Sequence, residues 1–323
     1  MRTFERLFVP LDFSASSHVA LRLASGLGDP PAQIYVAHAI EPWLPYVKDV
    51  LFPYAALGED EVEFEHELRQ QAHACIERTY NLGNLARCHA PEVLMGPAHK
   101  ALPGALKRVD ADLIVMGAFG ATGPKPESLG SVTSLVLRHV VDPVLVVRTH
   151  TPKPTIKRVV CALDLSAQSS TVLEAALSLA LSCGAQMETV YVLPDPLSHD
   201  TNNLLASQLK FDRSALLSHA KDKIEALFER AMDGVEVPFP LKQQVAGLWN
   251  TRRVLFGDPA KAVMAHADTV DADVVVVGSR NIQNTPGPLL GQTCWSITRR
   301  STTHVMVVPI EQASTLLDDQ AQG

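Results

Sequence analysis

The sequence predicts an α/β protein made of two tandem doubly wound (Rossmann-like) domains, each a five-stranded parallel sheet flanked by helices. Three observations support this fold class. The chain has 323 residues, which suits two domains of roughly 150 residues each. Blocks of the first half recur in the second half in the same order. Within each half, short apolar runs alternate with amphipathic segments, as in strands joined by helical crossovers.

The repeats establish the domain organisation. Three blocks recur: residues 109–117 (VDADLIVMG) as 270–278 (VDADVVVVG), residues 94–100 as 255–261, and residues 10–17 as 162–169. The first two pairs are 161 residues apart and the third pair 152, so the difference is absorbed in the middle of each half. Three matching blocks in one order indicate a duplication.

The boundary between the copies is marked by the prolines of residues 149–155 (THTPKPT), which suit a short extended linker. We therefore expect a first domain over residues 1–149, a linker over 150–155 and a second domain over 156–311. The last segment, residues 312–323, is polar, and we expect a flexible tail there.

Buried strands are predicted where a short run is apolar on both faces. Such runs lie at residues 7–9, 34–37, 113–116 and 144–147. Helical periodicity predicts helices over Ser17–Leu27 and Glu59–Tyr80, the second of them charged and at the surface. A long helix of the second half is predicted from the apolar stripe Leu217, Ile224, Leu227, Phe228 and Ala231.

Composition narrows the functional classes. A net charge of −7 argues against a broad nucleic-acid-binding face. No run of about 18 apolar residues is present, so we expect no membrane span. The chain starts with a strand-like run that lacks signal-peptide features, and its 5 cysteines are scattered without CxxC spacing. We therefore expect a cytoplasmic protein with reduced thiols.

The candidate site lies where doubly wound folds bind ligands, beyond the carboxyl ends of the strands. Asp12 follows the first strand directly, residues 117–120 (GAFG) follow the fourth, and residues 130–133 (GSVT) open the next helix. Glycines let the backbone approach phosphate oxygens, and a helix N-terminus offers free N–H groups to an anion. The hydroxyls of Ser131 and Thr133 add donors, and Asp12 suits an adenine amino group or a ribose hydroxyl.

Simpler interpretations exist for each of these residues. Asp12 equally suits a residue that caps the following helix or terminates the strand. Ser131 also suits an N-cap without a ligand, and the two glycines suit a tight turn. Each signal alone is weak, and their joint placement favours a phosphate site.

A longer pattern resembles a known family. Residues 117–131 fit Gly-x2-Gly-x9-Gly-Ser, which resembles the signature of the ATP-binding branch of the universal stress protein family. Residues 9–14 resemble that family's first strand with its adenine-side aspartate, residues 38–40 its second strand end, and residues 143–147 its last strand. The resemblance covers both halves, so the chain looks like a tandem universal stress protein.

The resemblance implies ATP, ADP or AMP as the ligand, with Mg²⁺ as an optional companion. The adenosine side would be formed by Pro10, Asp12, Ala39, Met116 and Gly117. The phosphate side would be formed by Gly120, Gly130, Ser131 and Val132, with Thr133 assisting. Ala39 stands where the family often has a larger apolar residue. The loop 121–129 carries two prolines and Lys125, which we interpret as a solvated lysine rather than a phosphate ligand.

The second copy departs further from the signature. Asn281 stands at the position of Gly120, and Gln292 at that of Ser131. We expect weak or no triphosphate binding there, with room for adenosine, AMP or another small ligand. The candidate residues of this second site are Asp164, Val192, Gly278, Gly291 and Thr293.

Two classes of function remain. The first is a stress-response regulatory protein that senses an adenine nucleotide without catalysis. The second is a slow ATPase or an adenosine-type hydrolase, but residues 117–133 offer only Glu127 as a carboxylate and the chain has no GxxxxGK[ST] loop. A carrier of another small or apolar ligand is a further alternative. We favour the sensor.

We expect no catalytic residue and no resident metal. His66 and His73 lie on a charged helix that we interpret as a solvated face. By resemblance, the two halves would pair through residues 143–148 and 304–309 as an internal pseudo-dimer, and a homodimer is possible. Nucleic acid and membranes are not expected partners.

Overall fold

The structure is a computed structural model that describes residues 4–28, 32–41, 58–120, 129–149, 155–166, 168–193, 218–219, 221–226, 229–230, 249–280 and 290–310. The first half contains β1 (Arg6–Pro10), α1 (Ala15–Ser25), β2 (Gln33–Ile40), α3 (Gly58–Tyr80), the 3-10 turn η1 (Leu82–Asn84), β3 (Glu92–Met95), α4 (Ala98–Val109), β4 (Leu113–Gly117), α5 (Ser131–His139) and β5 (Val144–Val147). The second half contains β6 (Arg158–Leu163), α6 (Ser169–Cys183), β7 (Gln186–Leu193), β8 (Trp249–Phe256), α9 (Pro259–Thr269), β9 (Val274–Arg280), α10 (Gln292–Arg300) and β10 (His304–Ile310).

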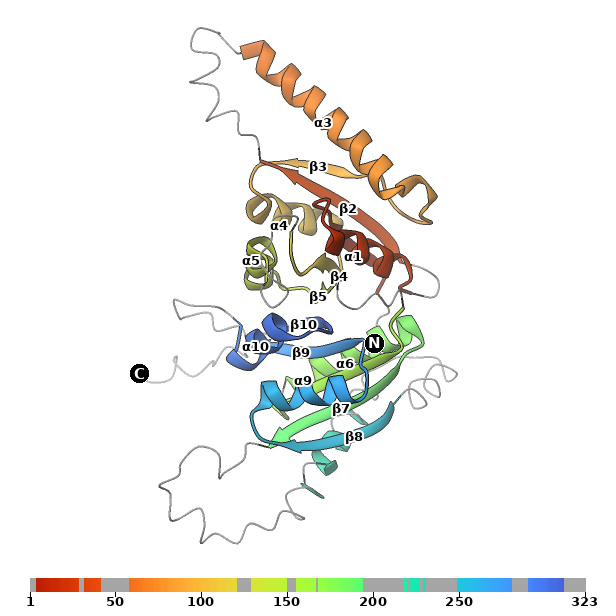
Figure 1. Ribbon diagram of the computed structural model, residues 1–323, viewed down its shortest axis with the longest axis vertical. Coiled ribbons are helices and arrows are strands. Elements are labelled where there is room, and N and C mark those ends of the chain that lie inside the picture. Colours follow the sequence, from red (N-terminus) through yellow and green to blue (C-terminus); the bar gives the residue numbers. More distant parts are fainter. Residues whose placement is uncertain are drawn as a thin grey trace, which may run out of the picture.

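The ten strands of the described residues form one sheet, in the order β3-β2-β1-β4-β5-β10-β9-β6-β7-β8. Within each half the strands are parallel, which confirms the predicted fold class of two doubly wound five-stranded units. Counted from the outer edge, both halves have the order 3-2-1-4-5. The two halves are therefore arranged about a pseudo-twofold axis, with β5 and β10 side by side at the centre (Figure 1).

The central pair β5–β10 is antiparallel, with Val305 opposite Val146 and Met306 opposite Leu145. These four side chains are 0% exposed, because helices cover both faces of the sheet at this point. The prediction that the halves pair through residues 143–148 and 304–309 is confirmed.

Two apolar cores lie on opposite faces of the sheet. Alternate residues of one strand point to different cores, as the pleat requires: Leu7 and Val9 belong to one core and Phe8 to the other. The first core is closed by α1, α3 and α6, and the second by α4, α5, α9 and α10. Both faces of the central strands β4 and β5 are buried, which is why these two strands are apolar.

The predicted helices agree with the structure within two residues at each end where they are described. The helix predicted over Ser17–Leu27 is α1, which begins earlier because Ser14 caps it: the Ser14 hydroxyl accepts from the Ser17 N–H at 3.1 Å. The helix predicted over Glu59–Tyr80 is α3. In the long helix predicted for the second half, Ile224 is helical and 0% exposed. The other four residues of that stripe, like the linker residues 150–154 and the tail 312–323, lie outside the described residues.

All five cysteines are free. Within the described ranges, no helix combines the length and the apolar character needed to cross a bilayer.

Candidate functional site

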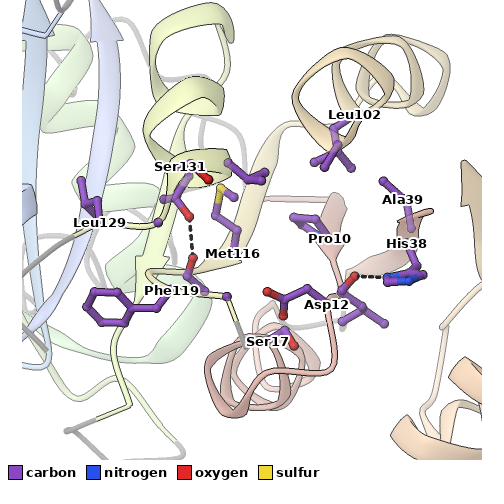
Figure 2. Close-up of a pocket in the computed structure, with 18 residues that line it drawn as sticks. Pro10, Asp12, Ser17, His38, Ala39, Leu102, Met116, Phe119, Leu129 and Ser131 are labelled. Atoms are coloured by element: carbon purple, nitrogen blue, oxygen red, sulfur yellow. Dashed lines mark hydrogen bonds between the residues drawn. The ribbon is translucent and has the colours of Figure 1, made fainter. Parts of the chain in front are cut away.

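A cavity of about 650 Å³ opens at the carboxyl ends of the strands of the first half. The structure brings all ten predicted first-site residues to its wall: Pro10, Asp12, Ala39, Met116, Gly117, Gly120, Gly130, Ser131, Val132 and Thr133. Figure 2 shows Pro10, Asp12 and Ala39 on one side of this space and Ser131 on the other. The juxtaposition is a property of the structure; that these residues bind a ligand remains a prediction.

Asp12 has a structural task as well as a place at the cavity. Its Oδ1 accepts from the Ser14 N–H at 3.1 Å and from the Ser14 hydroxyl at 2.5 Å, which closes the turn between β1 and α1. Its Oδ2 lies beside Gly120, where an added Cβ would stand 3.0 Å away. Ser14, not Asp12, is the helix cap. The carboxylate thus shapes the turn with one oxygen while the other lies beside the glycine loop.

The turn is held in place by Tyr80, the last residue of α3. Phe13 has a positive φ of 61°, an uncommon conformation for a side chain of this size. Its N–H donates to the Tyr80 hydroxyl oxygen at 2.7 Å, and that hydroxyl lies 2.8 Å from Oγ of Ser17. Burial raises the pKa of Tyr80, so the hydroxyl stays protonated. A surface helix therefore fixes the loop that carries Asp12.

At the other end of the cavity, α5 begins with an open N-terminus. Gly130 is its N-cap, with φ −62° and no side-chain cap. The Gly130 N–H donates to the Ala118 carbonyl at 2.8 Å, so the helix start lies against the loop after β4. Ser131 is exposed beside it. Free N–H groups and the positive end of the helix dipole suit an anion.

Gly117 and Thr133 contribute packing at the end of β4. A Cβ on Gly117 would stand 2.8 Å from Cβ of Ser16, so the glycine lets α1 approach the strand. The Thr133 hydroxyl is buried and donates to the Gly117 carbonyl at 2.8 Å. This bond ties α5 to β4, and direct assistance to a phosphate by Thr133 stays a prediction.

Eight further residues line the cavity: Leu11, Ser17, Ala37, His38, Ala98, Leu102, Phe119 and Leu129. His38 is a hydrogen-bonded strand-end residue, with Nδ1 2.6 Å from the Leu11 carbonyl. Because a carbonyl only accepts, Nδ1 carries the proton. Leu102 reaches the cavity from α4, and no nearby sequence motif predicts this contact. Phe119 was not among the predicted site residues, although its position between Gly117 and Gly120 is a signal that could have identified it.

The second half lacks several of these features. Asp164 keeps the turn, since its Oδ1 accepts from the Ser166 N–H at 3.0 Å. At Gly278, the counterpart of Gly117, an added Cβ would stand 2.8 Å from the Val172 side chain, whereas at Gly117 it would meet Ser16. The counterpart of Thr133 is Cys294, whose sulfur lies 3.9 Å from the Thr298 hydroxyl.

The remaining second-site candidates other than Gly278 lie on β7 and at the start of α10. Val192 lies buried in β7, Gly291 is the N-cap of α10, and Thr293 is exposed. Asn281, like Lys125 and Glu127 of the first half, lies outside the described residues.

The site's charge is limited. Among the described residues that line the cavity, Asp12 is the only carboxylate, and none is a lysine or an arginine. The described part of the chain contains no group of three His, Cys, Asp or Glu residues placed to hold a metal ion.

The two histidines of α3 make contacts along the surface of that helix. His66 lies 2.8 Å from Gln70, and His73 lies 3.9 Å from Glu77.

Comparison with known proteins adds the family. The model of the universal stress protein family matches residues 3–148 and again residues 155–309. The chain belongs to the universal stress protein family. Its two copies of the family domain make it a tandem member.

Individual relatives are distant. The chain is 27% identical over 154 residues to universal stress protein MJ0577 of Methanocaldococcus jannaschii. The aligned segment covers 45% of this chain and 95% of that protein. A universal stress protein structure from Archaeoglobus fulgidus matches 94% of this chain and 98% of its own, with a TM-score of 0.61 and 20% identity. A structure of a putative universal stress protein from Pseudomonas aeruginosa matches 95% and 93%, with a TM-score of 0.54 and 14% identity. At these identities the structural matches show the fold.

Proposed function

We propose that this universal stress protein binds an adenine nucleotide, ATP or its di- or monophosphate, in the first-domain cavity and acts as a cytoplasmic stress-response sensor. One observation carries the proposal: a single cavity has the Asp12 carboxylate at one side and the uncapped N-terminus of α5 at the other. A carboxylate accepts from an adenine amino group or ribose hydroxyls, and a helix N-terminus binds phosphate. A cavity of about 650 Å³ also lies within the usual range for small-ligand sites.

A sensing role is favoured over catalysis by the chemistry of the wall. Hydrolysis needs a positioned base or a set of metal-binding carboxylates. The described wall supplies one carboxylate, Asp12, and its Oδ1 already closes the β1–α1 turn. Mg²⁺, if it accompanies the nucleotide, would rest mainly on the phosphates.

The test is to identify and titrate the ligand. Mass spectrometry of small molecules released from the purified protein should show an adenine nucleotide, and calorimetry of the emptied protein should show one ATP site per chain. Finding neither a released nucleotide nor heat of ATP binding would refute the proposal. Single-turnover incubation with ATP addresses the alternative: ADP release above background that is lost in Asp12→Asn would make the protein an ATPase.

A further inference from the structure

Arg148 is a buried cation at the junction of the two domains. It follows β5 directly and is 0% exposed. Its backbone N–H donates to Nδ1 of His304, the first residue of β10, at 3.0 Å. Burial lowers the pKa of its guanidinium to about 10, which still leaves it charged at neutral pH. The first domain therefore places a fixed positive charge at the seam between β5 and β10.

The second domain holds this charge. Nη2 of Arg148 donates to the carbonyls of Thr298 and Arg299, the latter at 3.1 Å. These carbonyls belong to the last turn of α10, where backbone acceptors lack intrahelical partners and the helix dipole is negative. A guanidinium at this position satisfies orphan acceptors and interacts favourably with the dipole. The guanidinium of Arg148 is thus held by the last turn of α10.

The same guanidinium supports the loop of the first-domain cavity. Its Cζ lies 5.1 Å from the centroid of the Phe119 ring, within the range of a cation–π contact. Phe119 stands between Gly117 and Gly120, and its backbone carbonyl accepts from the Ser16 hydroxyl. Figure 2 shows its ring directed away from Asp12, toward elements of the second half. Phe119 therefore lines the cavity while its ring rests on a side chain that the other domain holds.

We propose that Arg148 is a positioning residue through which the second domain braces the nucleotide-binding loop of the first. Arg148 acts through Phe119 and is not among the described residues that line the cavity. A braced loop is ordered before the ligand arrives, whereas a loose loop must be ordered at the expense of affinity. For its affinity readout, this inference rests on the proposed nucleotide function.

The brace runs in one direction. In the aligned repeats, Pro309 of the second half is equivalent to Arg148, and Arg280 is equivalent to Phe119. Proline has no side-chain donor, so the second half cannot return the same contact to its own loop after β9. The arginine is thus present only for the loop that keeps the glycine signature. On this proposal, the divergent second domain supports the site of the first domain.

The matched control is Arg138 of α5. It crosses the same junction, but its guanidinium lies 5.8 Å from the Trp295 ring of α10 instead of over Phe119. Arg138→Met therefore weakens the junction while the loop keeps its support. Arg148→Met removes the support, and Arg148→Lys keeps the charge but loses the planar group over the ring.

The experiment titrates ATP into the full-length chain by calorimetry. We expect Kd to rise about fivefold in Arg148→Met and less in Arg148→Lys, with little change in Arg138→Met. Phe119→Leu should weaken binding similarly, and the double variant Arg148→Lys with Phe119→Leu should be no weaker than Phe119→Leu alone. Unchanged affinity in both folded Arg148 variants, or equal weakening in Arg148→Met and Arg138→Met, would overturn the inference.

Hydrogen exchange of the ligand-free protein keeps this test separate from the nucleotide proposal. Amides of residues 116–120 should exchange faster in the Arg148 variants than in the wild type or Arg138→Met. If the wild type fails to bind ATP, the proposed function is wrong, and the exchange result alone decides the inference. Unchanged exchange at residues 116–120 in both Arg148 variants would then refute the brace.

Discussion

The Tyr80 hydroxyl serves two groups of the loop that carries Asp12. It accepts from the Phe13 N–H at 2.7 Å and lies 2.8 Å from Oγ of Ser17. His18 stacks on its ring, with centroids 4.2 Å apart. A hydrogen bond of this kind contributes roughly 0.5–1.5 kcal/mol net, and the hydroxyl makes two such contacts, so it matters for the turn.

Tyr80→Phe tests that role. We expect a loss of about 1–2 kcal/mol in the free energy of unfolding, measured by urea denaturation, because the Phe13 amide loses its acceptor. Tyr35→Phe is the control, since the Tyr35 ring stacks on His89 in the same domain and keeps that contact without the hydroxyl. Equal losses in the two variants would show that the hydroxyl of Tyr80 has no special role.

Gly117 is a second residue whose importance is steric. A Cβ there would stand 2.8 Å from Cβ of Ser16, closer than real side chains allow. Gly117→Ala should destabilise the protein by about 1–3 kcal/mol, since α1 must move away from β4. Gly104→Ala, at an exposed position of α4 with a nearest contact of 3.6 Å, should instead stabilise by up to about 1 kcal/mol. Thermal unfolding of both variants measures the contrast, and a neutral Gly117→Ala would contradict it.

At the scale of elements, α5 and α10 both follow a glycine N-cap but differ in their first residue, Ser131 in α5 and Gln292 in α10. Both have a glycine N-cap, Gly130 and Gly291, with extended backbone. At Gly130, an added Cβ makes only ordinary contacts of 3.4 Å or more. The backbone therefore tolerates a side chain there, and a long one would extend from the wall of the cavity.

Gly130→Lys should abolish ATP binding, because its long side chain takes up the space beside the helix N-terminus that the phosphates need. Gly291→Lys should change ATP affinity little, because the site in the first half is untouched. Calorimetry on both folded variants makes the comparison. Equal losses would refute the difference that we propose between the two sites.

Elements of this fold are predictable where local pattern and burial agree. The runs at residues 113–116 and 144–147 are apolar throughout because two cores enclose them, so strands β4 and β5 follow from the sequence. The glycine pattern likewise located the start of α5. Arg148 shows the limit: its partners Thr298 and Arg299 are about 150 residues away in the chain, and nothing local distinguishes it from a solvated arginine. Leu102 was missed for the same reason.

At the scale of the whole molecule, the two domains share one sheet. The pairs Val146–Val305 and Leu145–Met306 continue the hydrogen-bonded ladder across the junction, and their side chains continue both cores. A single sheet with shared cores favours cooperative unfolding of the two halves. The duplication thus produces one structural unit in which the halves have different tasks.

Alkaline stability is a property of the whole molecule because thiols with a raised pKa lie in both halves. Burial raises the pKa of Cys88 to about 11 and that of Cys183 and Cys294 to about 12, from an ordinary value near 9. Between these values the unfolded thiols ionise while the folded ones remain neutral. The stabilisation is therefore complete below pH 9 and is lost as the pH rises toward 11 to 12.

The midpoint of urea unfolding should accordingly fall as the pH is raised from 8 to about 10. Cys294, which is 2% exposed, should account for about 1 kcal/mol of the accompanying loss in the free energy of unfolding. Cys294→Ala should therefore weaken the pH dependence while lowering stability overall. Ile297→Val is the control, because it alters the same buried face of α10 without a titrating group. It should lower the midpoint at every pH and leave the pH dependence unchanged. An identical pH dependence in Cys294→Ala and the wild type would show that this thiol ionises equally in the folded and unfolded chains.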